Sequence, residues 1–65
     1  MSCEDATARR YREHAEELRT IAESDRLEET RQLLLGVARD YDRMAENMEA
    51  IAEWRRYVEK HPKDD

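Results

Sequence analysis

The sequence predicts an all-α fold, an antiparallel helical hairpin that assembles as a four-helix bundle through dimerisation. Two stretches carry apolar residues at every third or fourth position, as amphipathic helices do, and one short run of capping residues separates them. The chain has only 65 residues, and a chain this small buries too little apolar surface to be stable alone. We expect one domain over residues 1–65, with frayed ends at about 1–3 and 62–65.

The first helix is expected at about residues 4–23. Ser2 and Asp5 lie where a helix N-terminal cap is needed, because a hydroxyl or carboxylate there accepts from free backbone N–H groups. The apolar residues of this stretch follow one another at spacings of three and four: Ala8, Tyr11, Ala15, Leu18 and Ala22.

A break at residues 23–26 separates the two helices. Asp25 is followed three residues later by Glu28, an arrangement that predicts a capping box at the start of the second helix. The second helix is expected at about residues 26–60, because Pro62 cannot continue it and should end it near Glu59 or Lys60. A linker this short makes the two helices antiparallel neighbours.

The second helix follows a heptad pattern. With Leu34 at position a, the d positions hold Val37, Met44 and Ile51. Three alanines occupy the adjacent e positions and predict that this helix has more than one neighbour: Ala38, Ala45 and Ala52. Gly36 lies in mid-helix, where glycine costs about 1 kcal/mol relative to alanine. The pattern leaves open whether Gly36 and Leu35 mark a second contact.

An antiparallel register that places Tyr11 opposite Tyr41 also aligns Ala15 with Val37 and Ala8 with Met44. The first helix then ends opposite about Met48, and the remainder of the second helix has no partner within the chain. This unpaired end predicts the partner interface, for which the candidate residues are Ile51, Trp54, Tyr57 and Val58.

The charge pattern disfavours nucleic acids and anionic membranes as partners. Charged residues make up 45% of the chain, and the formal net charge is −5. The charge is negative in both halves, which disfavours non-specific binding to phosphate groups. An alternative interpretation is a small regulatory protein that binds nucleic acid through a local basic group: Arg9, Arg12 and Arg19.

The residues whose side chains are of catalytic or metal-binding type do not form a recognisable site. His14 has Glu17 three residues on, but the helical di-iron pattern places Glu before His, and that position is Tyr11. Cys3 lacks a neighbouring base that could activate it. We therefore predict no catalytic, cofactor or metal site and no enzyme. The single cysteine and the absence of a long apolar run predict a cytoplasmic protein without a membrane segment.

Three motifs carry a resemblance to known sequences: YRxxAEELR beginning at Tyr11, ETRxxLL beginning at Glu29 and YDRxAE beginning at Tyr41. In these motifs, over about residues 8–49, the chain resembles a group of short bacterial helical proteins. The resemblance implies a bacterial, cytosolic helical hairpin and no particular activity. In length and architecture alone, the chain also resembles the Rop-type RNA-binding hairpin dimers.

Together these features predict a non-enzymatic, oligomeric protein-interaction or assembly module. A homodimer is the first expectation and a homotetramer the second, and an unidentified protein partner stays open. The nucleic-acid-binding hairpin dimer is kept as the alternative.

Overall fold

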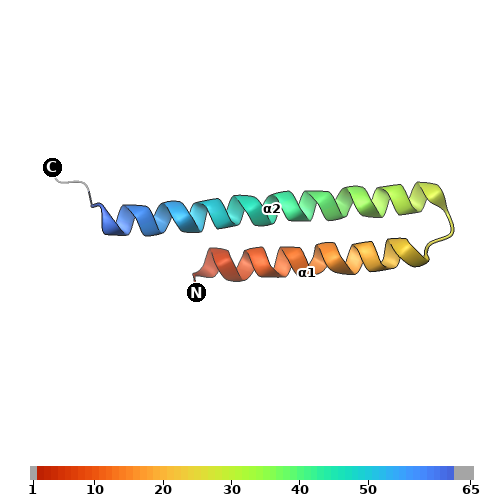
Figure 1. Cartoon of the computed structure of the whole chain (residues 1–65), viewed down its shortest axis with the longest axis horizontal. Helices are drawn as coiled ribbons and strands as arrows, with labels where there is room; N and C mark the ends of the chain where they lie inside the picture. The colour runs from red at the N-terminus through yellow and green to blue at the C-terminus, as the bar shows by residue number, and fades with distance from the viewer. Residues whose placement is uncertain (1, 63–65) are drawn as a thin grey trace.

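Two antiparallel helices joined by a short loop make up the computed structural model, which describes residues 2–62 (Figure 1). Helix α1 spans Cys3–Ser24 and helix α2 spans Glu28–Lys60, and the described residues contain no strand. The predicted all-helical hairpin is confirmed, and its helix limits differ from the expected ones by at most two residues. The fraying predicted for residues 1 and 63–65 lies outside the described residues.

The start of α1 is held by a reciprocal pair of hydrogen bonds. The hydroxyl oxygen of Ser2 accepts from the backbone N–H of Asp5 at 3.1 Å, and the same hydroxyl donates to Asp5 Oδ2 at 3.0 Å. The predicted cap is therefore confirmed. Helix α1 begins at Cys3, directly after this cap, and fraying at residues 2 and 3 stays a prediction.

The loop differs from the predicted capping box. α1 continues through Ser24, so Asp25 ends α1 instead of starting α2, and its carboxylate accepts from the backbone N–H of Leu27 at 2.9 Å. α2 begins after Leu27, which makes no side-chain cap. The capping-box prediction is wrong because the chain reverses over three non-helical residues, 25–27, so that Leu27 and not Asp25 precedes the first turn of α2.

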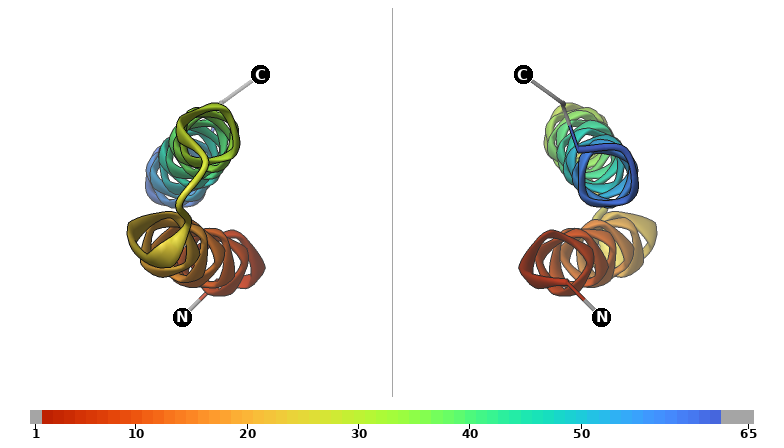
Figure 2. Two further views of the ribbon diagram at one scale, coloured as in Figure 1. Left: turned by 90° about the vertical axis from the view of Figure 1, so that its right-hand side faces the viewer. Right: turned by 90° about the vertical axis from the view of Figure 1, so that its left-hand side faces the viewer.

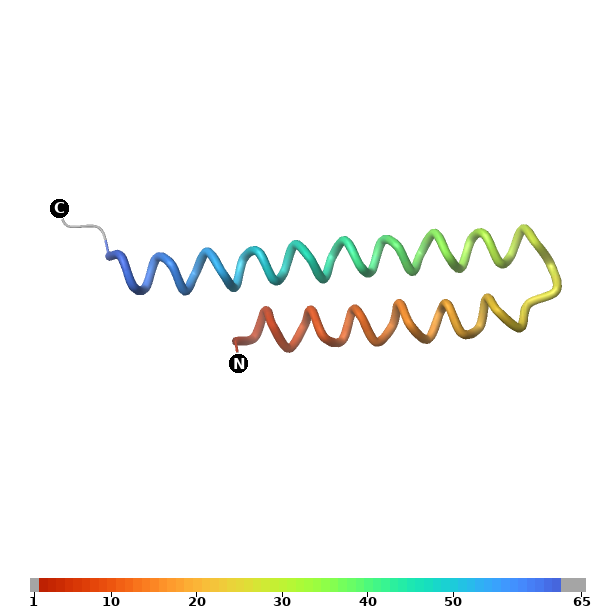
Figure 3. Tube along the Cα trace, in the orientation of Figure 1, coloured from red at the N-terminus to blue at the C-terminus, as the bar shows by residue number. Residues whose placement is uncertain are grey.

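α2 is longer than α1, with 33 residues against 22, and it runs past the start of α1 (Figure 3). It ends at Lys60, as predicted from Pro62. The backbone N–H of His61 donates to the carbonyl oxygen of Tyr57 at 2.9 Å and closes the last turn.

A seam of alanines lies between the two helices. Each is at most 1% exposed, and they recur every seven residues along each helix: Ala8, Ala15 and Ala22 on α1, and Ala38, Ala45 and Ala52 on α2. A methyl group is the smallest side chain that still buries apolar surface, so these positions let the helices approach closely. Burying a methyl group stabilises a fold by about 0.8 kcal/mol, so the six alanines stabilise the hairpin by on the order of 5 kcal/mol.

The alanine seam corrects the predicted core of α2. Val37, Met44 and Ile51 were expected at d positions against α1, yet they are 37–45% exposed. The helix is rotated so that the e-position alanines face α1 instead. Two helices without a third neighbour gain most from close approach, which bulky residues in the seam would prevent.

One side of the alanine seam is closed by ion pairs. Arg12 donates to both carboxylate oxygens of Glu49, at 2.7 and 3.3 Å, and its guanidinium lies 4.0 Å from Asp42, which also pairs with Arg19. Side chains lean toward the N-terminus of their own helix. In an antiparallel pair they therefore lean toward each other, which is how Arg12 reaches Glu49.

The molecule is a single layer of two rods. Its extents are 60 × 18 × 9 Å, and its radius of gyration is 16.3 Å, whereas a compact domain of this length has a radius of about 11 Å. The end-on views show the two helices with no further element on either side (Figure 2). The hairpin therefore has two broad sides, one of them closed by ion pairs.

Candidate interaction surface

The other side of the alanine seam is lined by large apolar side chains. Tyr11 and Tyr41 meet across it, with ring centroids 5.8 Å apart, whereas the next residues along each helix, Arg12 and Asp42, face each other on the opposite side. Residues three, four or seven positions from Tyr41 share its side of α2. Repeating the seven-residue step along α2 defines the apolar face: Tyr11 and Leu18 from α1, and Leu34, Val37, Tyr41, Met44, Met48, Ile51 and Val58 from α2.

No side chain within the described chain covers the apolar face fully. Tyr11, Leu18, Tyr41 and Met48 are half-buried, and Val37, Met44, Ile51 and Val58 are exposed. A fully buried Val, Leu, Ile or Met side chain stabilises a fold by about 1.5–3 kcal/mol. In the hairpin, the large apolar residues of α2 obtain only part of this stabilisation.

The four residues predicted as the partner interface do not all lie together. Ile51 and Val58 belong to the apolar face. Trp54, which is 64% exposed, lies at its edge, because a residue three positions beyond Ile51 is displaced by about 60° around the helix. Tyr57 is displaced from Ile51 by about 120°, and its ring stacks against His61 with centroids 4.5 Å apart.

The junction between α1 and the unpaired end of α2 is more closely packed than the register predicted. Ala52 is buried, and two arginines reach back to the start of α1. Arg55 Nη1 lies 3.3 Å from Glu4 Oε2, and Arg56 Nη1 lies 3.1 Å from Asp5 Oδ2. The stretch of α2 without intrachain contacts is therefore shorter than expected, although Ile51 and Trp54 are still exposed.

This junction contains a buried acid. Glu4 is 7% exposed, and its Oε1 atom has no hydrogen-bond partner among residues 2–62. The neighbouring Asp5 is held in its ionised form. The Ser2 hydroxyl, together with the guanidinium of Arg56, keeps the pKa of Asp5 below its ordinary value of 3.8. The junction therefore joins the helix cap to the unpaired end of α2.

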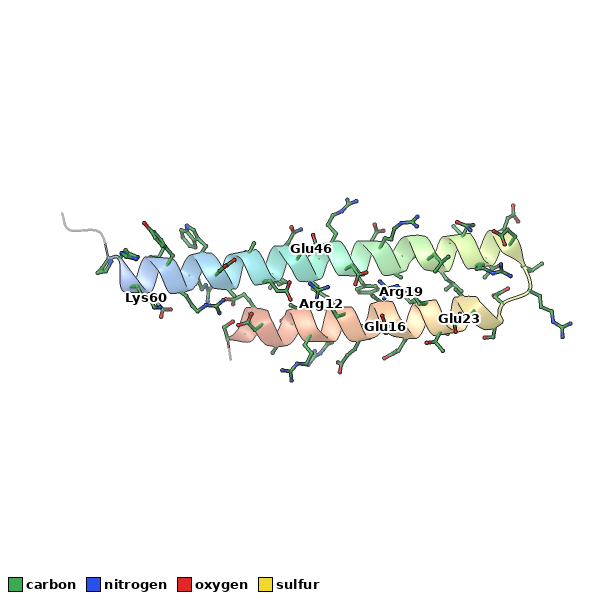
Figure 4. All side chains as sticks on the ribbon, in the orientation of Figure 1. Arg12, Glu16, Arg19, Glu23, Glu46 and Lys60 are labelled. Carbon is green, nitrogen blue, oxygen red and sulfur yellow. The ribbon has the colours of Figure 1, made fainter. Side chains whose placement is uncertain are left out.

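Two of the three arginines of the alternative nucleic-acid face are engaged within the hairpin. Figure 4 shows Arg12 and Arg19 between the helices. The hydrogen bonds to Glu49, and the negative charge of that residue, raise the pKa of Arg12. Arg19 donates to Glu16 at 2.7 Å and pairs with Asp42. Arg9 is exposed. These ion pairs neutralise much of the charge that phosphate groups would require.

The described surface has shallow, open hollows. One of about 190 Å³ lies on the apolar face between Val37, Tyr41 and Met44. A second, of about 490 Å³, borders the face at Leu33 and Gly36. Among the described residues, a methyl group added at Gly36 would meet only the guanidinium of Arg39, at 3.9 Å, so none of them requires a glycine at this position.

The residues considered for metal or thiol chemistry do not converge. His14 Nδ1 lies 4.0 Å from Glu17 Oε2, and its ring packs on Tyr41 with centroids 5.3 Å apart. Cys3 is exposed. Among the described residues, no three side chains of metal-binding type are grouped.

The sequence-based prediction missed the central part of the apolar face, Val37 and Met44, because it assigned these residues to the hairpin core. The matched seven-residue repeats of alanine on both stretches were the signal that could have revealed it, since they predict a seam made of methyl groups. Neither described helix is long and apolar enough to cross a membrane. No protein-family model matches the chain, and comparison with curated proteins and with solved structures gave no match either.

Proposed function

We propose that the chain is a non-enzymatic assembly module whose apolar face binds a second copy of the chain, giving a homodimeric four-helix bundle. The observation that supports this most directly is the accessible surface. The hairpin exposes 5502 Å², whereas a folded monomer of 7.8 kDa exposes about 4,400 Å². The excess, about 1,100 Å², is comparable with the roughly 800 Å² that each partner buries in a standard protein interface.

The composition of the apolar face supports the same proposal. It is rich in Met and Tyr, which are enriched in protein interfaces, and it extends along α2 at heptad spacing, as a helix-packing surface does. Ile51, Val58 and Trp54 continue it beyond the level where α1 begins. The interface that we propose therefore differs from the predicted one: it adds Met44 and Val37 toward the loop and leaves out Tyr57.

Regulatory binding of nucleic acid has less support. Two of its three arginines, Arg12 and Arg19, are paired with acids of the hairpin. A cytoplasmic location is still a prediction from the cysteine content of the sequence.

Sedimentation equilibrium with two matched variants tests the proposal. Met44→Glu places a carboxylate at the centre of the apolar face, and burying it without a partner costs several kcal/mol. Tyr57→Glu makes the same kind of change on the same helix but outside the face. We expect a dimer at micromolar concentration for the wild type and for Tyr57→Glu. For Met44→Glu we expect the dissociation constant of the dimer to be at least about 100-fold higher.

A wild-type chain that is helical by circular dichroism but monomeric at these concentrations would contradict the proposal. If the wild type sedimented as a homotetramer, the proposed dimer would be wrong and the second predicted assembly would take its place. Equal weakening by both variants would show that acidic charge in general, rather than the apolar face, controls association.

A further inference from the structure

Exposed large apolar residues occur at both ends of the hairpin, beyond its central part. At the loop end they are Ile21, Leu27 and Leu33, and at the unpaired end of α2 they are Trp54, Tyr57 and Val58. A partner that covers only the middle of the apolar face would leave both groups in water. The arrangement of the two copies therefore decides whether these residues are buried.

We infer that the two copies pack with their loops at opposite ends, so that α2 lies antiparallel to α2 of the second copy with the two-fold axis near Met44. This inference rests on the proposed homodimer and specifies its geometry. It assigns a partner surface to each end of the hairpin: the loop end of one copy covers the unpaired end of the other.

The unequal helices support this arrangement. α1 lies beside the loop-proximal part of α2, so the loop end has two helices and the other end has one (Figure 1). With the loops at opposite ends, the two-helix end of one copy lies over the one-helix end of the second copy. With the loops together, both one-helix ends would lie at the same end, and the missing α1 turns would leave them uncovered.

The spacing of the apolar residues of α2 supports an axis near Met44. Val37 and Ile51 lie seven residues on either side of it, and Thr30 and Val58 lie fourteen residues away. A two-fold axis at Met44 therefore places Val37 opposite Ile51 of the second copy. A contact across a two-fold axis requires a surface that complements itself. The apolar residues spaced evenly on both sides of Met44 meet this requirement.

The same axis accounts for Trp54 and Gly36. Trp54 comes to the level of the turn that contains Leu33 and Gly36 of the second copy, where the structure has an open hollow of about 490 Å³. Glycine leaves this hollow free within its own chain, because the nearest atom to an added methyl group would be 3.9 Å away. An indole ring seated there would bury the most exposed edge of the apolar face.

Spin-label distances separate the two arrangements. In a chain with Cys3→Ser, a spin label attached at Lys60→Cys gives the distance between the ends of the two α2 helices. Lys60 is exposed and is the last helical residue of α2. Residues 60 of the two copies should lie about 50 Å apart for an axis near Met44, since each residue adds 1.5 Å of helix. With the loops together they should lie under about 20 Å apart, because diagonal helices of a bundle are separated by little more than one helix diameter.

A label on Glu46→Cys is the matched control. Residue 46 is exposed and close to the proposed axis, so its pair should be separated by only about 6 Å along the helix in the opposed arrangement. We expect the Lys60 distance to exceed the Glu46 distance by at least about twofold. A Lys60 distance as short as the Glu46 distance in a sample that sediments as a dimer overturns the opposed arrangement and leaves the proposed dimer standing. A monomer overturns both.

Discussion

At the residue scale, the contacts of Ser2 and Asp5 decide where α1 begins. Ser2 satisfies a backbone N–H that the first turn would otherwise leave free, and its hydroxyl stabilises the ionised form of Asp5. Arg56 extends this small network to α2. The start of α1 is therefore coupled to the junction with the unpaired end of α2.

Substituting Ser2→Ala should lower the free energy of unfolding by about 1 kcal/mol, the usual effect of losing a serine cap. It should also move the pKa of Asp5 upward toward 3.8. Thermal unfolding and an NMR titration of the Asp5 carboxyl carbon measure the two effects. Thr7→Ala is the control, since the Thr7 hydroxyl donates to the Cys3 carbonyl but caps nothing. An unchanged Asp5 pKa in Ser2→Ala would contradict the assigned cause.

The pH dependence follows from the same residue. The pKa of Asp5 is lower in the folded chain than in the unfolded chain, so its contribution to stability is complete above about pH 4 and is lost as the pH falls through the lowered pKa. Asp5→Asn should therefore flatten the acid side of the stability curve in that range. Urea unfolding of the wild type and of Asp5→Asn between pH 2.5 and about pH 6 measures the free energy of unfolding as a function of pH. If that free energy fell equally in both proteins below about pH 4, Asp5 would not be the cause.

At the scale of the helices, the sequence predicted the elements well and their facing sides less well. The ends of α1 and α2 were recovered from Pro62 and the three-four spacing, and the Tyr11–Tyr41 contact followed from the register. The rotation of α2 could not be obtained in the same way. Heptad assignment places bulky residues in the seam, but close approach of only two helices favours alanine, and both solutions fit the same apolar spacing.

Substituting Ala45→Leu should destabilise the hairpin by about 1–3 kcal/mol, because a larger side chain in the seam forces the helices apart. Ala50→Leu is the matched control on the same helix. Ala50 is exposed, and surface substitutions usually change stability by less than about 0.5 kcal/mol. Urea unfolding of both variants provides the comparison. Equal stability of the two would show that the seam tolerates bulk and that the helices are not held at close range by alanine.

At the scale of the whole molecule, the fold class could be predicted from the sequence, whereas the surface available to a partner could not. The unequal helices indicated an unpaired end with Ile51 and Trp54. The larger part of the apolar face became visible only with the rotation of α2, which moved Val37 and Met44 out of the hairpin core. The position of Tyr57 away from Ile51 likewise depends on the side of α2 that faces α1.

If folding and association are coupled, the melting temperature should depend on protein concentration. For a dimer of two 65-residue chains, tenfold dilution should lower the melting temperature by about 5 °C, because each tenfold change in concentration is worth about 1.4 kcal/mol against the unfolding entropy of both chains. Circular dichroism over a hundredfold concentration range measures this shift. A melting temperature independent of concentration would indicate that one hairpin is stable alone.

The thin alanine seam has a consequence for the lifetime of the protein in a cell. The buried core of the hairpin is only six alanines, which is small for a folded domain, and a protease degrades the open form of a protein in proportion to its population. If the chain pairs as proposed, pairing lowers that population, so newly made chains would be short-lived until enough copies accumulate and long-lived afterwards. The amount of protein would then rise abruptly once its concentration exceeds the level at which the chains pair. After synthesis stops, the last copies would be degraded faster than the first.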